Sequence, residues 1–277
     1  MHIDSFIYAD LNSLKFIIKN DILHPAMLCA IVSTLFHNSN TRVFTTKKFA
    51  WENLIDANID YLLEYLCTIH SELVQQWRDN NLYNLLYIAL TGDGTYEQLN
   101  KWIHKLLSVD CDMFEVYPIT DMLYNTPFHC LIGGLHYDIA LDVCSKKSKS
   151  EIKKIINQID SNTQCNLIMQ ILYRYRYLKN NSWLLKLFDV IELLFDLGID
   201  VDHVDKYNQN ITDYLMHYKY FEVFSNKLKE KYNLPNATND RIGLYTVYNH
   251  KNPSPYVSLL YKYRYAKSNN ELTLFIN

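Results

Sequence analysis

Apolar residues along this chain recur mainly at helical spacing, three or four positions apart. The clearest example covers residues 183–197, where the charged side chains are Lys186, Asp189, Glu192 and Asp196. These charges fall on one stripe of a helix, and most other positions are Leu, Ile, Val or Phe. A helix with such a wide apolar face needs neighbours on two or more sides. The pattern therefore predicts helices that stack on one another.

A repeated segment predicts where helices end. Two apolar residues are followed by a turn residue and then Asp, at residues 54–60, 106–112 and 194–200. Gly, Asn and Asp tolerate the left-handed conformation that often follows the last helical turn. We interpret each of the three copies as the last turn of a helix and its exit.

A second repeated segment predicts where helices begin. Thr126 is a good N-cap and Pro127 a good first helical residue. Asn210 takes the same cap position in the segment 205–215, with Asn208 in the preceding turn. Thr163 is the third predicted opening, which places the openings 37 and 47 residues apart.

These segments resemble the ankyrin repeat. Thr126–His129 resembles the family's T-P-L-H signature, and residues 135–140 fall where the family places G-H-x-E-I-V. The resemblance is strongest over 121–144 and 191–224. It implies an all-α, ankyrin-repeat-like helical solenoid with degenerate and extended repeats. The repeats are called extended because the predicted openings are further apart than the usual period of about 33 residues. Insertions are then expected near 145–153 and 179–182.

The same resemblance divides the chain into two regions. Residues 1–80 are expected to form a degenerate helical, N-terminal capping region, in which 61–77 reads as an inserted helix. Residues 81–277 are expected to hold the ankyrin-like repeats, with C-terminal capping helices at the end. A near-repeat of residues 172–179 at 260–267 supports this interpretation.

Composition limits the function classes. Of 277 residues, 49% are hydrophobic and 21% charged, as in soluble globular proteins. The net charge of −3 gives no field that would steer nucleic acid or an anionic membrane. The lysines at 146–154 and the Tyr/Arg segments suit single-stranded nucleic acid, but also suit solvated helix faces. We favour the second interpretation and expect no nucleic-acid partner.

Neither a membrane span nor a signal peptide is expected. Residues 183–197 are too few and too charged to cross a bilayer. Asp4 and Asp10 interrupt the place where the apolar run of a signal peptide should lie. We expect a location in the cytoplasm or, after secretion, in the cytosol of a host cell.

Catalytic and metal-binding motifs are not visible. The six cysteines form no C-x-x-C pair, so buried free thiols are expected. His129 and Cys130 are adjacent, and adjacent helical residues point about 100° apart, so they are not expected to act as a pair. In the ankyrin pattern this His is structural. We expect no catalytic residue, no metal site and no cofactor.

The resemblance to ankyrin proteins implies that loop tips and the first-helix face bind a partner protein. The positions of this surface are Met122, Leu123, Asn125, Lys206, Tyr207, Gln209, His217 and Tyr218. Tyr207 and Tyr218 are the expected hot spots, since aromatic side chains contribute large contact areas.

The degenerate repeats and the Asn-, Ile-, Lys- and Tyr-rich composition resemble ankyrin proteins that large DNA viruses, or intracellular bacteria such as Legionella, use against eukaryotic hosts. The C-terminus looks like another repeat rather than an F-box-like segment, which favours the bacterial version. We expect a secreted virulence effector that binds a eukaryotic host protein. The alternative is an enzyme with a small catalytic unit in residues 1–80, where Cys29, Cys67, His24, His37 and His70 are the candidates, and with the repeats as its substrate-binding arm.

Overall fold

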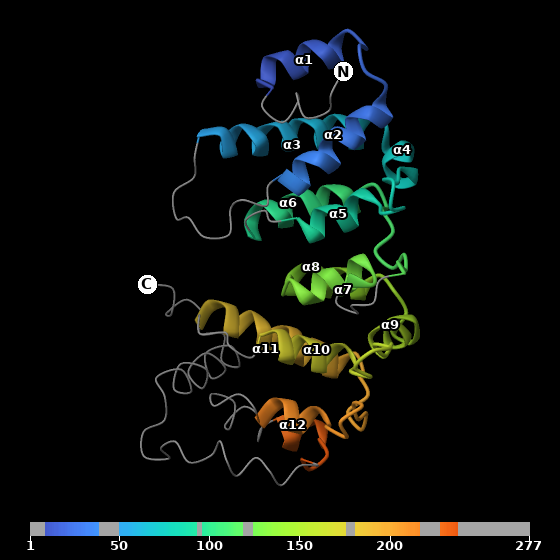
Figure 1. The fold of residues 1–277 in the computed structure, drawn as a ribbon, viewed down its shortest axis with the longest axis vertical. Helices are drawn as coiled ribbons and strands as arrows, with labels where there is room; N and C mark the ends of the chain where they lie inside the picture. Colours follow the sequence, from blue (N-terminus) through green and yellow to red (C-terminus); the bar gives the residue numbers. More distant parts are fainter. Residues whose placement is uncertain are drawn as a thin grey trace. The chain divides into compact units, whose positions relative to one another are not determined.

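The structure, a computed structural model, describes residues 9–38, 50–92, 96–118, 124–175, 181–216 and 228–237. This part of the chain is all-α and has no β-strand, only antiparallel bridges between single residues at Ile159–Asn166 and Val204–Asn210. Figure 1 labels the helices, which are α1 (Leu11–Lys19), α2 (Pro25–Asn38), α3 (Ala50–Ile69), α4 (Ser71–Gln76), α5 (Leu85–Thr91), α6 (Tyr96–Leu107), α7 (Pro127–Gly133), α8 (Tyr137–Ser145), α9 (Lys149–Ile156), α10 (Leu167–Arg174), α11 (Asn181–Asp196) and α12 (Ile211–Met216).

The chain divides into two compact units. The first unit comprises Met1–Ile119 and Tyr124–Ala140, and the second comprises Thr120–Leu123 and Leu141–Asn277. The boundary expected near residue 80 falls inside the first unit. The expected C-terminal capping helices, over residues 238–277, lie outside the described residues.

Helices of the first unit pack pair on pair. Helix α2 packs against α3, and α5 packs against α6 (Figure 1). The pairs also meet in series, because α2 contacts α5, α5 contacts α7, and α3 contacts α6. Helix α5 lies among these neighbours, and its residues from Leu85 to Ala89 are all buried. Burial on every side explains why α5 carries no polar stripe.

Helix starts follow from capping residues. Thr126 accepts a hydrogen bond from the backbone N–H of His129, and Pro127 is the first residue of α7, as predicted. Asn210 caps α12 in the same way, also as predicted. The third predicted opening, Thr163, was wrong. Asn166 caps α10, while the Thr163 hydroxyl donates to Asp160 and so belongs to the preceding loop.

Helix ends follow from residues in the left-handed conformation. Asp110 has a φ of 56° and Gly198 a φ of 84°. The amide of the next residue reaches back to the last turn, from Cys111 to Leu106 and from Ile199 to Leu194. This hydrogen bond is the signature of a Schellman motif. The helix ends predicted at 106–112 and 194–200 are therefore confirmed.

The third predicted helix end, at residues 54–60, was wrong because this segment lies inside α3. Its acidic residues instead hold α3 to α6. Asp56 accepts from the side-chain amide of Gln98, and Asp60 accepts from the indole N–H of Trp102 at 2.8 Å. Because these carboxylates are four residues apart, they face the same neighbour. A pattern that normally marks an exit thus serves here as an interhelical contact.

Two other expectations on helix placement had mixed outcomes. The insertion expected at 145–153 overlaps α9, an additional helix that begins with a capping box between Ser148 and Glu151. The single helix expected over 61–77 was wrong, since α3 ends at Ile69 and α4 begins at Ser71. Across the described residues, no helix is both long and apolar enough to cross a membrane.

Candidate partner-binding surface

The loop before α12 is held in one conformation by a single carboxylate. Asp205 accepts from the backbone N–H groups of Tyr207 and Gln209, both at 2.8 Å. The Asp205 backbone N–H closes the loop on the Gln209 carbonyl oxygen at 2.9 Å. Asn208 adopts a left-handed φ of 58°, which Asn tolerates well. The loop is therefore fixed by its own sequence before any partner binds.

The loop before α5 is built in the same way. Asp79 accepts from the backbone N–H groups of Asn81 and Tyr83, both at 2.8 Å, and closes on the Tyr83 carbonyl at 3.0 Å. The loop before α10 is one residue longer and uses Asp160 as its acceptor. An Asp at the start of the loop and an Asn at its end thus recur in front of α5, α10 and α12.

The asparagine that ends each loop also bridges to a distant segment. The side-chain amide of Asn84 donates to the Asp112 carbonyl at 3.0 Å, and that of Asn166 to the Asp200 carbonyl at 3.0 Å. Asn210 donates in the same way to the Asn236 carbonyl at 2.6 Å. Both Asp112 and Asp200 follow a Schellman motif. The first two bridges therefore join the start of one helix to the exit of a later one.

Buried polar side chains hold Asp205, and with it the loop, in place. The Tyr214 hydroxyl donates to Asp205 at 2.8 Å and lies 3.2 Å from the Cys165 sulfur. All three side chains are buried. Burial, together with the hydrogen bonds to Cys165 and Asp205, raises the pKa of Tyr214. The neutral phenol is thus the form that the fold selects.

Two loops of the second unit lie side by side. The backbone N–H of Lys206 donates to the Thr163 carbonyl at 3.2 Å, and its ammonium group donates to the Asn162 carbonyl at 2.8 Å. His203 Nε2 lies 2.5 Å from the Gln164 carbonyl oxygen. We call residues 159–166 and 203–209 together the loop surface.

The loop surface presents a large aromatic side chain to solvent. Tyr207 is 68% exposed, and the Lys206 ammonium lies 5.2 Å from the centre of its ring. Ile159 and Val204 are also exposed, and each directly precedes the Asp that closes its loop. The surface therefore combines a rigid backbone with exposed apolar groups and one cation.

Three of the residues predicted to bind a partner lie on this surface, namely Lys206, Tyr207 and Gln209. Asn125 lies in the first unit, where its carbonyl oxygen accepts from the Tyr117 backbone N–H at 2.8 Å. Lys206, Tyr207 and Gln209 belong to the second unit. The remaining predicted residues, Met122, Leu123, His217 and Tyr218, lie outside the described residues.

Sequence reasoning missed Ile159 and Val204. Their signal is the dipeptide of an apolar residue followed by Asp, which occurs just before each loop. This signal was missed because an Asp after an apolar residue is also typical of a helix end. Here the Asp instead begins a loop and accepts hydrogen bonds from its backbone N–H groups. Asn162, whose carbonyl receives the Lys206 ammonium, gave no signal in the sequence at all.

Burial keeps the two cysteine candidates of residues 1–80 in the thiol form. Burial raises the pKa of the Cys29 thiol to about 12 and that of Cys67 to about 11, so neither is a thiolate near neutral pH. His129 is buried and lies 3.0 Å from the Thr126 hydroxyl, in the structural role expected for it. His37 is described only as part of α2.

All six cysteines are free, and all but Cys144 are buried, as the sequence predicted. The described residues hold no cluster of three or more His, Cys, Asp or Glu side chains that could bind a metal ion.

Comparisons with known proteins do not place the chain in a family. No family model matches it, and neither a curated protein nor a solved structure does so.

Proposed function

We propose that this chain is an ankyrin-repeat-like scaffold that binds a partner protein through its loop surface. The recurrence of one local plan supports the proposal. The N-caps Asn84, Thr126, Asn166 and Asn210 are 40 to 44 residues apart. This period exceeds the usual ankyrin value of about 33 residues. The additional helix α9 lengthens one of the intervals, and the non-helical residues 111–118 lengthen another.

The exposure of Tyr207 is the observation on which the proposal rests. A tyrosine that is 68% exposed on a loop fixed by Asp205 offers contact area at a low cost in conformational entropy. Its ring carries a hydroxyl at one end, so it suits an interface that is apolar in the centre and polar at the rim. Val204 and Ile159 extend the apolar part of that surface.

A matched pair of variants tests the proposal. Tyr207→Ala removes the predicted hot spot, whereas Tyr173→Ala removes another exposed tyrosine of the second unit, which lies on α10 and is not part of the loop surface. Partners captured from eukaryotic lysate with the wild-type chain are purified and their affinity for each variant is measured. We expect Tyr207→Ala to weaken binding at least tenfold, since hot-spot truncations commonly cost more than about 2 kcal/mol. Equal affinity of the two variants would contradict the proposal.

We further propose that the partner is a eukaryotic host protein and that the chain acts as a secreted effector of an intracellular bacterium. The support is the resemblance of the degenerate repeats, together with the composition rich in Asn, Ile, Lys and Tyr. Capture from host and bacterial lysates in parallel tests this part. We expect specific, Tyr207-dependent capture from the host lysate alone.

A further inference from the structure

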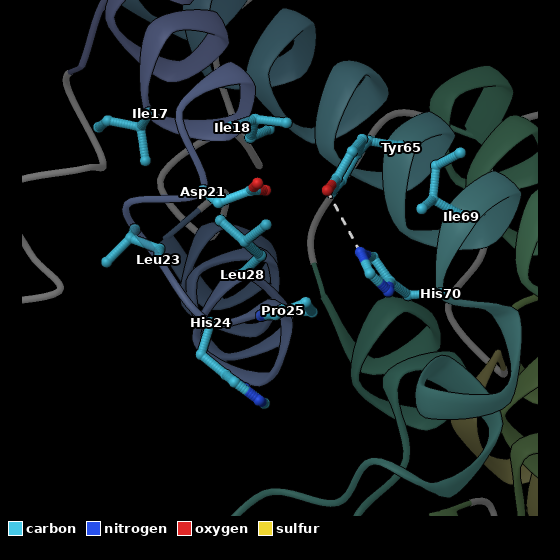
Figure 2. A pocket seen from close by; sticks show the side chains of 10 residues that line it. All are labelled: Ile17, Ile18, Asp21, Leu23, His24, Pro25, Leu28, Tyr65, Ile69 and His70. Atoms are coloured by element: carbon cyan, nitrogen blue, oxygen red, sulfur yellow. Dashed lines mark hydrogen bonds between the residues drawn. The ribbon is translucent and has the colours of Figure 1, made fainter.

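The first unit contains a cavity far along the chain from the loop surface. It lies among α1, α2, α3 and His70 and has a volume of about 430 Å³ (Figure 2). This volume is within the range of roughly 300–1,000 Å³ that small-ligand sites usually have. Its apolar wall consists of Ile17, Ile18, Leu23, Pro25, Leu28 and Ile69.

One carboxylate lines this cavity. Asp21 follows α1 in the left-handed conformation, with a φ of 50°. Its backbone N–H donates to the Ile18 carbonyl, and the next amide, from Ile22, donates to the Ile17 carbonyl, both at 3.1 Å. The backbone that carries the carboxylate is thus fixed by a Schellman motif. Figure 2 shows the carboxylate turned toward the side of the cavity where Tyr65 and His70 lie.

Asp21 is an exposed residue at the rim of the cavity, and its side chain has no hydrogen bond or ion pair within the part of the chain that the structure describes. The neighbouring polar groups are already engaged. His70 Nε2 lies 3.2 Å from the Tyr65 hydroxyl, and His24 Nδ1 accepts from the Ala26 backbone N–H at 3.2 Å. Neither Lys nor Arg lines the cavity. The cavity therefore combines an apolar wall with one negative charge.

We propose that this cavity binds a primary alkylammonium group. The hydrocarbon chain lies along Ile18, Leu28 and Ile69, and the ammonium donates a charge-assisted hydrogen bond to the Asp21 carboxylate. Tyr65 also lines the cavity, and an aromatic ring is a further favourable partner for a cation. A lysine side chain in a peptide and a free amphiphilic amine share this chemistry.

The test compares n-hexylammonium with 1-hexanol, its neutral counterpart of similar length. Binding is followed through the ring signals of Tyr65 and His70 in NMR spectra of the full chain. We expect hexylammonium to bind at least tenfold more tightly than hexanol. Asp21→Asn should abolish that difference while hexanol binding remains unchanged. Asn is well suited to the left-handed conformation, so this variant keeps the helix end.

Asp110→Asn is the matched control, because Asp110 takes the same position at the end of α6, with a φ of 56°, and does not line the cavity. It should leave the tenfold preference intact. A second variant, Asp21→Gly, removes the carboxylate while allowing the same backbone. Equal binding of hexylammonium and hexanol to the wild type, or an unchanged preference in both Asp21 variants, would overturn the proposal.

Competition experiments identify the source of the amine. An acetylated and amidated Gly-Lys-Gly peptide is compared with its norleucine counterpart, which lacks the ammonium group. Displacement of hexylammonium by the lysine peptide alone assigns the cavity to a lysine side chain. Continued hexylammonium binding without displacement assigns it to a free amine.

Discussion

The side-chain amide of Asn166 donates a 3.0 Å hydrogen bond to the backbone carbonyl of Asp200, 34 residues further along the chain. The carbonyl oxygen of the same side chain accepts from the Met169 backbone N–H at 3.2 Å. One buried side chain therefore both starts α10 and holds the exit of α11. Asn84 does the same for α5 and the exit of α6.

These two roles of Asn166 can be separated by mutation. Asn166→Ala removes both the cap and the bridge, and we expect it to lower the free energy of unfolding by about 2 kcal/mol, roughly half from each. Asn166→Ser keeps an acceptor for Met169 and should cost about 1 kcal/mol. Urea unfolding followed by circular dichroism measures both. Equal losses in the two variants would show that the cap contributes nothing, and an Asn166→Ser variant as stable as the wild type would show the same of the bridge.

The chain's helix ends were predictable where a left-handed residue of a suitable type follows an apolar pair, as at Asp110 and Gly198. The same geometry occurs at Leu135, where φ is 60°. Its residue type gave no signal, because Leu rarely adopts that conformation, and only the resemblance, which puts the family's Gly at this position, indicated it. At Asp56 and Asp60 the residue types suited an exit, but contacts with α6 overrode the local preference. Local pattern predicts a helix end only when tertiary contacts do not compete for the same side chains.

The candidate site was predictable in part for a similar reason. Lys206, Tyr207 and Gln209 follow from the position of the loop between predicted elements. Ile159 and Asn162 belong to a second loop about 40 residues earlier, and only the hydrogen bonds between Lys206 and that loop bring them alongside. Sequence spacing gives the members of one loop, whereas the neighbour of a loop depends on how the helices stack.

Alkaline pH should weaken the fold through Tyr214. Its pKa is raised from an ordinary value of 10.0, chiefly by burial, so the folded state keeps the phenol neutral. Below pH 10 both states are neutral and the contribution of this group is fully present. Above pH 10 the unfolded state ionises first, and stability falls as the pH rises toward the folded-state pKa.

Tyr214→Phe tests this pH dependence. At pH 8 the variant should be about 1 kcal/mol less stable than the wild type, because the hydrogen bond to the buried Asp205 is lost. This difference should shrink as the pH rises above 10, since only the wild type keeps the group that titrates. Thermal unfolding between pH 8 and 11 measures the trend, with Tyr173→Phe on α10 as the exposed control. A constant difference across this range would contradict the assignment.

Gly198 should resist substitution because of its backbone conformation. Its φ of 84° lies in the region that side chains with a Cβ rarely adopt. A Cβ there would lie 3.5 Å from Lys153 Cδ, an ordinary van der Waals contact, so space is not the obstacle. We expect Gly198→Ala to cost about 1 kcal/mol of stability, and Gly198→Asn to cost less. Urea midpoints of the two variants check the order, and a larger loss for Asn would point to crowding instead.

Leu82 and Asn208 occupy equivalent positions in loops of the same design. Each directly precedes the residue whose carbonyl accepts from the backbone N–H of the loop's Asp, namely Tyr83 and Gln209. Their φ values are 68° and 58°. Leu82 is 70% exposed, so packing of its apolar side chain adds little stability. Its left-handed backbone conformation suits Asn far better than Leu. The position thus holds a residue that stability alone would not select.

Exchanging these two residue types should change the free energy of unfolding in opposite directions at the two positions. Leu82→Asn should raise the free energy of unfolding by about 1 kcal/mol, and Asn208→Leu should lower it by about the same amount. Thermal and urea unfolding of the two variants provide the measurement.

If Leu82→Asn were destabilising, the exposed Leu side chain would have to make a stabilising contact that its 70% exposure argues against. A stabilised variant would instead support selection of Leu82 for contact with another molecule, because an exposed apolar side chain in an unfavourable conformation needs a benefit outside the fold.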